Sequence, residues 1–248
     1  MARYQVVIAY DGTDFSGFQR QAKARTVQSV VETALKQVGW QGKSILAAGR
    51  TDTGVHASGQ VIAFDLNWGH NPGDLQRALN ASLPADIAVR AVMQVEDHFH
   101  PRYDARYRHY RYRIFCDDVR QPLYERYAWR VWPAVEFNLL EMAASLLPGK
   151  HDFAAFGTPP RTGGSTIRNV YHAGWKQEDE FLRFEITADA FLYRMVRRLV
   201  FWQVNAGQGK INPGELPCYL QGKEAPKVLG TAPAAGLTLV EVGYANGE

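Results

Sequence analysis

The order of strand and helix patterns in the first hundred residues constrains the fold of this chain more than any other feature. Thr26 is suited to cap a helix whose apolar residues recur at helical spacing as far as Val38, and Gly39 follows as a stop signal. A second helix is predicted from Pro72 to Leu83. Strands are predicted at residues 3–10, 44–48, 60–66 and 87–95. The resulting order is β-α-β-β-α-β, as in a ferredoxin-like fold.

The rest of the chain shows a similar but longer alternation of patterns. Strands are predicted at residues 106–115, 127–132, 167–176, 181–187 and 237–242. Helices are predicted at residues 137–147 and 191–206, with a short one starting at Pro213. The pattern breaks at Pro101, so we expect one half at residues 1–100 and the other at residues 101–248. The sequence therefore predicts an α+β fold made of two ferredoxin-like (RRM-like) halves.

The composition is typical of a soluble globular protein. The chain has 248 residues, 46% of them hydrophobic, which is enough to bury a sizeable core as one large domain or two small ones. Its two cysteines, Cys116 and Cys218, fit a reducing compartment rather than a disulfide framework. Residues 1–7 lack a signal-peptide layout, and no apolar run is long enough to span a bilayer. We therefore expect a cytoplasmic protein with no membrane association.

Arginine and tyrosine residues alternate along one predicted strand. The segment 103–115 reads YDARYRHYRYRIF, although the whole chain carries a formal net charge of only +3. Guanidinium groups bind phosphates in two-point contacts, and interleaved aromatic rings suit unstacked RNA bases. A solvated basic strand face with tyrosines packed beneath it explains the same pattern. This segment alone leaves the choice between the two open.

A polar loop between two predicted strands is the strongest candidate for chemistry. Residues 47–57 read AAGRTDTGVHA, which places one carboxylate, Asp52, among an arginine, two threonines, two glycines and a histidine. Arg50 can hold Asp52 in its ionised form, as a nucleophile or a base requires. The alternative is an Asx-turn in which Asp52 bonds its own backbone before Gly54. Local spacing alone favours the turn, whereas the rest of the sequence favours chemistry.

The sequence contains none of the common signatures of a cofactor or metal site. It lacks a phosphate-binding P-loop, a dinucleotide-binding glycine motif and clustered Cys and His ligands. The motifs therefore give no sign of a bound nucleotide, dinucleotide or metal ion. A metal-dependent hydrolase that uses Asp11, Asp14 and Asp52 is a rival interpretation of the carboxylates, and full activity in EDTA would exclude it.

With these motifs in order, nearly the whole chain resembles the tRNA pseudouridine synthases of the TruA type. The block GRTDTGVHA at residues 49–57 is specific when it occurs together with the other family motifs. Those motifs are AYDGT (9–13), GFQRQ (17–21), TVQ (26–28), YRY (110–112), HDF (151–153), FLYRMVR (191–197) and AAGL (234–237). Three places depart from the family pattern. Phe18 stands for a tryptophan, Phe201 for a glycine, and Ala154 begins an Ala-Ala pair where serines are usual.

The resemblance implies an isomerase that converts uridine to pseudouridine at positions 38, 39 and 40 of the tRNA anticodon stem-loop. Such enzymes break the N1–C1′ glycosidic bond, turn the uracil and rejoin it through C5, so the resemblance implies no cofactor and no metal. The resemblance also implies a continuous, mostly antiparallel sheet with a central active-site cleft, and a homodimer that binds the tRNA across both subunits.

The resemblance also assigns roles to single residues. Asp52 matches the nucleophile, and Arg50 matches the arginine that enters the stem as the target base leaves it. Tyr110 matches the active-site tyrosine that stacks on the base, and Arg197 matches the arginine that pairs with the aspartate. The expected substrate-binding set consists of Phe191, Leu192, Met195, His56 and Gln60. Ordinary core packing explains the three apolar members of this set equally well.

A non-catalytic RNA-binding module is the alternative function. Two RRM-like halves that present basic and aromatic strands would bind RNA without changing it. The usual aromatic RNP strand pattern is missing, however, and the Asp52 loop has no place in such a module. An assay that follows isomerisation separately from RNA binding distinguishes the two functions.

Overall fold

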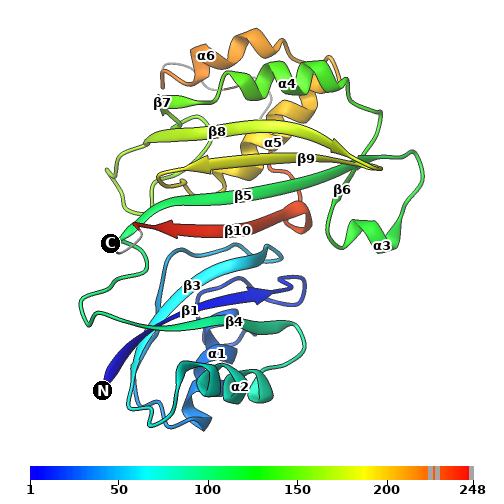
Figure 1. Ribbon diagram of the computed structural model, residues 1–248. Coiled ribbons are helices and arrows are strands. Elements are labelled where there is room, and N and C mark those ends of the chain that lie inside the picture. The colour runs from blue at the N-terminus through cyan, green and yellow to red at the C-terminus, as the bar shows by residue number, and fades with distance from the viewer. Residues whose placement is uncertain (223–225, 227–229, 246–248) are drawn as a thin grey trace. The chain divides into compact units, whose positions relative to one another are not determined.

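The computed structural model divides the chain into two compact units and describes residues 1–222, 226 and 230–245 (Figure 1). Unit 1 comprises Met1–Arg106 together with Thr238–Glu248, and unit 2 comprises Tyr107–Leu237. This division differs from the boundary expected at residues 100 and 101 because the last strand belongs to unit 1. This strand follows all the elements of unit 2 in the sequence, so its position along the chain does not reveal that it belongs to unit 1.

Unit 1 combines a mostly antiparallel sheet with two helices. Its elements are β1 (Ala2–Tyr10), α1 (Val27–Gln37), β2 (Leu46–Ala47), β3 (His56–Leu66), α2 (Pro72–Ser82), β4 (Ile87–Val95) and β10 (Leu237–Tyr244). The strand order is β4-β1-β3-β10, and β2 pairs with β3. β1 is antiparallel to β3 and β4, whereas β10 runs parallel to β3. The predicted β-α-β-β-α-β order of the first half is confirmed.

Both helices of unit 1 begin where their capping residues predict. The Thr26 hydroxyl accepts a hydrogen bond from the Ser29 backbone N–H, and the Ser29 hydroxyl accepts one from the Thr26 N–H, which forms a capping box. The Asn71 side chain accepts from the Asp74 N–H at 2.9 Å, with Pro72 in the first turn of α2. These contacts span three residues, so the local sequence is sufficient to specify them.

Unit 2 is a second mostly antiparallel sheet with helices. Its elements are β5 (Ala105–Cys116), α3 (Pro122–Glu125), β6 (Trp129–Val131), α4 (Phe137–Ser145), β7 (Gly149–Asp152), β8 (Ile167–Glu178), β9 (Phe181–Ala188), α5 (Met195–Gly207), the 3-10 helix η1 (Pro213–Glu215), α6 (Leu216–Tyr219) and the 3-10 helix η2 (Ala234–Gly236). The strand order is β5-β9-β8-β7, all antiparallel, and β6 pairs with β5 in parallel. The predicted α+β fold class is confirmed.

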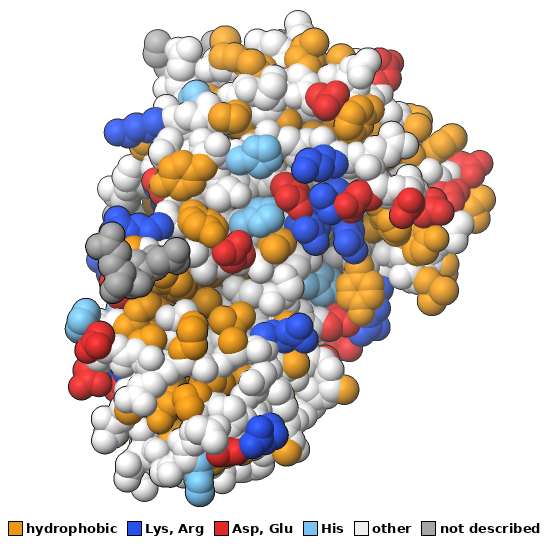
Figure 2. All heavy atoms as spheres, in the orientation of Figure 1, with side chains coloured by type: hydrophobic (Ala, Val, Ile, Leu, Met, Phe, Trp, Pro, Cys, Tyr) orange, Lys and Arg blue, Asp and Glu red, His pale blue; other side chains and the backbone are white. Residues whose placement is uncertain are grey.

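The arginine–tyrosine strand β5 presents two different faces. Tyr112 is buried together with Phe184, its partner on β9, whereas Arg111 on the other face pairs with Glu185 of β9. The Arg111 Nε donates to Glu185 Oε1 at 2.9 Å, and His109 Nε2 lies 3.2 Å from Oε2. Figure 2 shows basic, acidic and histidine side chains gathered over this part of the molecule. One face of β5 therefore carries a partly buried cluster of ion pairs, and Tyr112 packs into the core on the opposite face.

The charges around Glu185 change its acidity. Burial raises the pKa of the Glu185 carboxyl, but the Arg111 hydrogen bond and the nearby His109, Arg111 and Arg183 charges outweigh burial and leave the pKa below its ordinary value. Glu185 is therefore ionised near neutral pH, and it offsets part of the positive charge that the sequence places on this strand.

One predicted helix begins later than its sequence pattern indicates. We predict a helix from Phe191, but α5 starts at Met195, because Tyr193 is held in a β-bridge. Tyr193 and Thr158 form an isolated antiparallel bridge, with the Tyr193 N–H donating to the Thr158 carbonyl at 2.9 Å. Apolar spacing does not reveal this bridge between residues far apart in the sequence. Within the part of the chain that the structure describes, no helix is long and apolar enough to cross a membrane.

Candidate active site

The loop that carries Asp52 joins β2 to β3 in unit 1, and two hydrogen bonds to β3 hold its first residues. The Ala48 N–H donates to the Val61 carbonyl at 2.9 Å. The Gln60 side-chain amide donates to the Gly49 carbonyl at 3.1 Å, and its oxygen accepts from the Val61 N–H. Gln60 is fully buried, so these bonds fix the backbone immediately before Arg50.

Thr51 is held through both its side chain and its backbone. Its hydroxyl lies 2.8 Å from the Tyr10 hydroxyl at the end of β1, and both residues are buried. Its carbonyl accepts the Phe18 N–H at 3.1 Å. The Phe18 carbonyl in turn accepts the N–H of Gln28 in the first turn of α1 at 2.9 Å. The peptide that leads into Asp52 is thus connected to both β1 and α1.

A tight turn begins at Asp52 itself. The Val55 N–H donates to the Asp52 carbonyl at 3.1 Å, and Gly54 occupies the third position with φ of +76°. A positive φ at that position is the requirement of a type II turn, which glycine meets without strain. Gly12 packs directly on the turn, where an added Cβ would lie 2.0 Å from the Val55 carbonyl oxygen.

This turn leaves the two charged side chains of the loop accessible. Asp52 is half-buried, and Arg50 is exposed. The alternative Asx-turn also placed a turn at these residues. In the structure the bond that closes the turn is accepted by the Asp52 backbone carbonyl. A rigid backbone with an accessible carboxylate is the arrangement that a positioned nucleophile requires.

His56 and Gln60, which we expected to bind substrate, are buried and contact the protein's own backbone. The His56 Nδ1 accepts the Gly12 N–H at 3.0 Å and lies 3.1 Å from Asp11 Oδ1. His56 therefore contacts the Asp11–Gly12 segment through both a backbone N–H and a carboxylate. Both side chains therefore hold the loop that surrounds Asp52.

Unit 2 contains four other predicted site residues, and two of them are in contact. The Tyr110 and Phe191 rings meet edge to face with centroids 5.0 Å apart. Leu192 is buried against Gly157, where an added Cβ would lie 2.4 Å from the Leu192 Cβ, and Met195 is fully buried at the start of α5. Phe191 and Tyr110 are partly exposed, so this pair has the accessible apolar surface that a uracil wall needs.

Arg197 on α5 is held against the segment that follows α6. Its Nε donates to the Ala232 carbonyl at 2.8 Å, and its own carbonyl accepts the Ala232 N–H at 3.1 Å. The Tyr112 hydroxyl donates to the nearby Pro233 carbonyl at 2.7 Å. Burial raises the pKa of Tyr112 well above its ordinary value, so the phenol remains a neutral donor. The guanidinium of Arg197 is therefore oriented by backbone contacts.

Residues that sequence reasoning missed support these site residues. Tyr10, Gly12 and Phe18 hold the Asp52 loop, and Ala232 holds Arg197. Tyr10, Gly12 and Phe18 could have been found through the motifs AYDGT and GFQRQ that contain them, although their residue types alone did not reveal this supporting role.

Groups of possible metal ligands are absent from the described residues. Across residues 1–222, 226 and 230–245, no three His, Cys, Asp or Glu side chains are grouped so that they could hold a metal ion.

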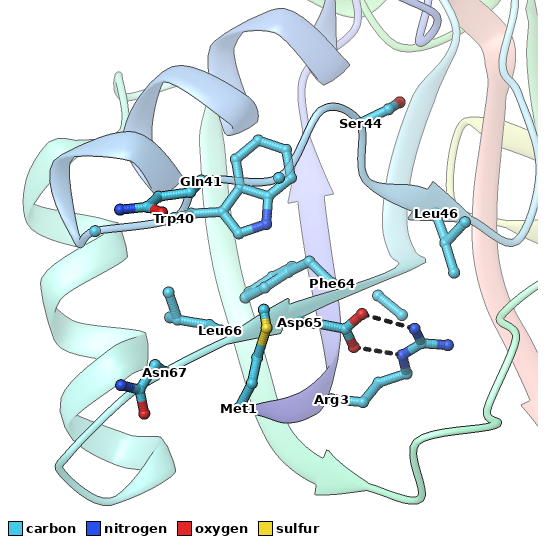
Figure 3. Close-up of a pocket in the computed structure, with 13 residues that line it drawn as sticks. Met1, Arg3, Trp40, Gln41, Ser44, Leu46, Phe64, Asp65, Leu66 and Asn67 are labelled. Carbon is cyan, nitrogen blue, oxygen red and sulfur yellow. Dashed lines mark hydrogen bonds and ion pairs between the residues drawn. The ribbon is translucent and has the colours of Figure 1, made fainter.

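A hollow of about 580 Å³ in unit 1 lies between Trp40, Phe64 and the Arg3–Asp65 ion pair (Figure 3). Its lining contains none of the predicted site residues.

Comparison with known proteins identifies the family. The family model described as tRNA pseudouridine synthase matches residues 6–104 and 143–245. The chain belongs to the tRNA pseudouridine synthase family. It is therefore an enzyme of the isomerase class. The matched ranges contain the Asp52 loop and the start of α5, whereas Tyr110 lies in the intervening segment.

Individual relatives agree with the family match. The chain is 38% identical to tRNA pseudouridine synthase A of Acetivibrio thermocellus over 245 residues, which is 98% of this chain and 100% of the relative. It is 40% identical to the protein of the same name from Brevibacillus brevis, with the same coverage. A chain in the solved structure titled "Crystal Structure of a Cbf5-Nop10-Gar1 Complex" matches 81% of this chain and 45% of its own length, with 11% identity and a TM-score of 0.36. That score is too low to support a conclusion.

Proposed function

We propose that this protein converts uridine to pseudouridine at positions 38, 39 and 40 of the tRNA anticodon stem-loop, with Asp52 as the nucleophile. The observation that carries the proposal is the Asp52 loop, in which an accessible carboxylate stands on a backbone held by β1, β3 and the 12–18 segment. Membership of the tRNA pseudouridine synthase family supports the reaction type.

The reaction is an isomerisation, so its atoms balance within the nucleotide. The N1–C1′ bond breaks, the uracil turns, and a C5–C1′ bond forms. The C5 proton leaves, and N1 gains a proton. The Asp52 carboxylate attacks carbon, either at C1′ or at C6 of uracil, and departs again when the new glycosidic bond is complete.

The remaining residues position the base and its charge. Arg50 is exposed beside Asp52, and a planar guanidinium can occupy the space that an extracted base leaves in the stem. Tyr110 and Phe191 offer an edge-to-face pair against which the uracil stacks. Arg197 provides a cation that Ala232 holds in one orientation.

Assembly and location follow from the same proposal. The net charge of +3 is small for a protein that binds a folded RNA, so we expect a homodimer whose two copies share the tRNA. We expect it to act in the cytoplasm, where tRNA is modified, without a membrane partner. Light scattering that gives a monomer mass for fully active protein would contradict the dimer.

The test is single-turnover conversion of an unmodified tRNA transcript by excess enzyme, with pseudouridine mapped by position. Wild-type protein should modify positions 38, 39 and 40. Asp52→Asn should reduce the rate by about 10⁴-fold or more while tRNA affinity stays the same or rises, because the nucleophile and one negative charge are lost.

Two outcomes would overturn the proposal. Turnover by Asp52→Asn near the wild-type rate would remove the aspartate mechanism. Tight tRNA binding by the wild-type protein without any pseudouridine would favour the RNA-binding module instead.

A further inference from the structure

The turn that precedes α5 contains an arginine at a position that favours glycine. The Met195 N–H donates to the Leu192 carbonyl at 3.2 Å, which closes a turn over residues 192–195. Arg194, in the third position, has φ of +61° and ψ of +8°. Glycine or asparagine is the usual residue there, because a larger side chain meets its own backbone in the left-handed region.

The surrounding structure imposes this conformation on Arg194. The bridge to Thr158 keeps Tyr193 extended, and α5 begins two residues later at Met195. Leu192 is fixed as well, because it packs on the backbone of Gly157. Arg194 is therefore the residue at which the chain turns from a strand bridge into a helix, and its exposed side chain adds nothing to the buried core.

The side chains at this turn form an aromatic and cationic pair on the surface. The Arg194 guanidinium carbon lies 4.9 Å from the centroid of the Tyr193 ring, and Tyr193 is 51% exposed. Among the described residues, no carboxylate forms an ion pair with Arg194. Arg111 and Arg120, by contrast, are paired with Glu185 and Glu125. Arg194 thus has a charge available for an outside partner.

We propose that Tyr193 and Arg194 form a nucleotide-binding platform, in which the Tyr193 ring stacks on a base and Arg194 binds a phosphate of the RNA substrate. Backbone strain at a residue whose side chain stays outside the core points to a use of that side chain beyond folding. An exposed ring beside a guanidinium matches an unpaired nucleotide, which offers a flat face and a negative charge. The pair directly follows Phe191 and Leu192, so the bound nucleotide neighbours the target uridine. This inference rests on the proposed tRNA substrate.

The test uses Arg194→Gly and measures both stability and binding to an unmodified tRNA transcript. Glycine relieves the strain, so the Tm should stay the same or rise by up to about 4 °C. The affinity for tRNA should fall by about 10-fold, and the log–log slope of affinity against salt should become shallower by about 0.7 to 0.9, as expected for one lost phosphate contact. Arg194→Lys should retain the slope because it retains the charge.

Tyr193→Leu tests the other half of the platform. It removes the ring without adding charge, so affinity should fall by about 5- to 100-fold while the salt slope is unchanged. Asp179→Gly is the matched control. Asp179 is the other non-glycine residue with a positive φ among the described residues, at +49°, and it is exposed in the β8–β9 hairpin. This control should also keep or raise the Tm, but without weakening tRNA binding.

The outcomes separate this inference from the proposed function. A wild-type protein that modifies tRNA, together with Arg194→Gly and Tyr193→Leu variants that bind tRNA normally, would overturn the platform alone. A marked drop in Tm for Arg194→Gly would show that Arg194 serves folding and would overturn it as well. A wild-type protein that neither binds nor modifies tRNA would defeat the proposed function itself.

Discussion

Two turns of the same kind occupy the two regions proposed to contact substrate, and they differ at one position. In the turn Asp52–Val55 of unit 1, the third residue is Gly54, with φ of +76°. In the turn Leu192–Met195 of unit 2, the third residue is Arg194, with φ of +61°. Glycine makes the first turn relaxed, so the carboxylate that begins it can be placed accurately. Arginine makes the second turn strained, and the proposed phosphate contact of its side chain gives a reason for an arginine at this position.

The surroundings of the two turns differ in the same sense. Buried hydrogen bonds from Tyr10, Phe18 and Gln60 hold the residues before Asp52. The second turn is held by the Tyr193–Thr158 bridge, and its exposed side chains are left to solvent. Under the two proposals, the firmly held first turn places the nucleophile, and the exposed second turn contacts the RNA.

The largest expected effect comes from Gly12, which packs on the first turn. Gly12→Ala would place a Cβ about 2.0 Å from the Val55 carbonyl oxygen, a distance that forces the backbone to move. We expect a loss of about 3 kcal/mol or more in unfolding free energy and a large loss of turnover. Urea unfolding and single-turnover assays measure the two effects. An unchanged midpoint in urea would mean that the loop is less tightly packed than described.

Gly54 gives the next largest effect and the sharpest contrast with Arg194. Gly54→Ala should cost about 1–2 kcal/mol, because alanine is strained at φ of +76°. Gly54→Asn is the control, since asparagine tolerates this region and should cost less. Thermal unfolding of both variants beside Arg194→Gly tests the comparison. We expect Gly54→Ala to lower the Tm and Arg194→Gly to keep or raise it. A lower Tm for both variants would contradict the comparison.

The Tyr10–Thr51 hydrogen bond provides a smaller effect on the same loop. Tyr10→Phe or Thr51→Val removes one partner of a buried 2.8 Å bond, so each should cost about 1–2 kcal/mol. The single-turnover rate should fall more than tRNA affinity does, because the bond positions the peptide before Asp52. The double variant should lose less than the sum of the two single variants, as expected for residues in direct contact. Additive losses would show that the two hydroxyls do not act together.

The smallest expected effect is a pH dependence at the Arg3–Asp65 ion pair of unit 1. The hydrogen bond from Arg3 holds the pKa of the Asp65 carboxyl below its ordinary value. The ion pair therefore adds stability that is present above the unfolded pKa of about 3.9 and is lost as the pH falls through the folded pKa. Asp65→Asn should lower the Tm slightly at pH 7, and the difference from wild type should vanish below about pH 3. A constant difference at all pH values would indicate a packing effect instead.

The sequence by itself determined the elements that rest on short-range contacts. The caps at Thr26 and Asn71 act within three residues, so α1 and α2 begin where predicted, and β4 has the predicted bounds of 87–95. The family could also be identified from the sequence, because its motifs and their order along the chain can be matched without knowledge of the fold. The candidate residues Asp52, Arg50, Tyr110 and Arg197 came from that resemblance, and their roles stay predictions.

Only the tertiary structure decided features that depend on residues far apart in the chain. β3 begins at His56, four residues before the predicted strand, and its first two residues pair with Thr238 and Leu239 of β10. The strand predicted at 44–48 shortens to Leu46–Ala47, which is the part that pairs with β3. The bridge between Thr158 and Tyr193 likewise sets where α5 begins, which is at Met195 and not at Phe191. Periodicity reports which face of a segment is apolar, whereas strand ends and strained joints are set by the partner that hydrogen-bonds to them.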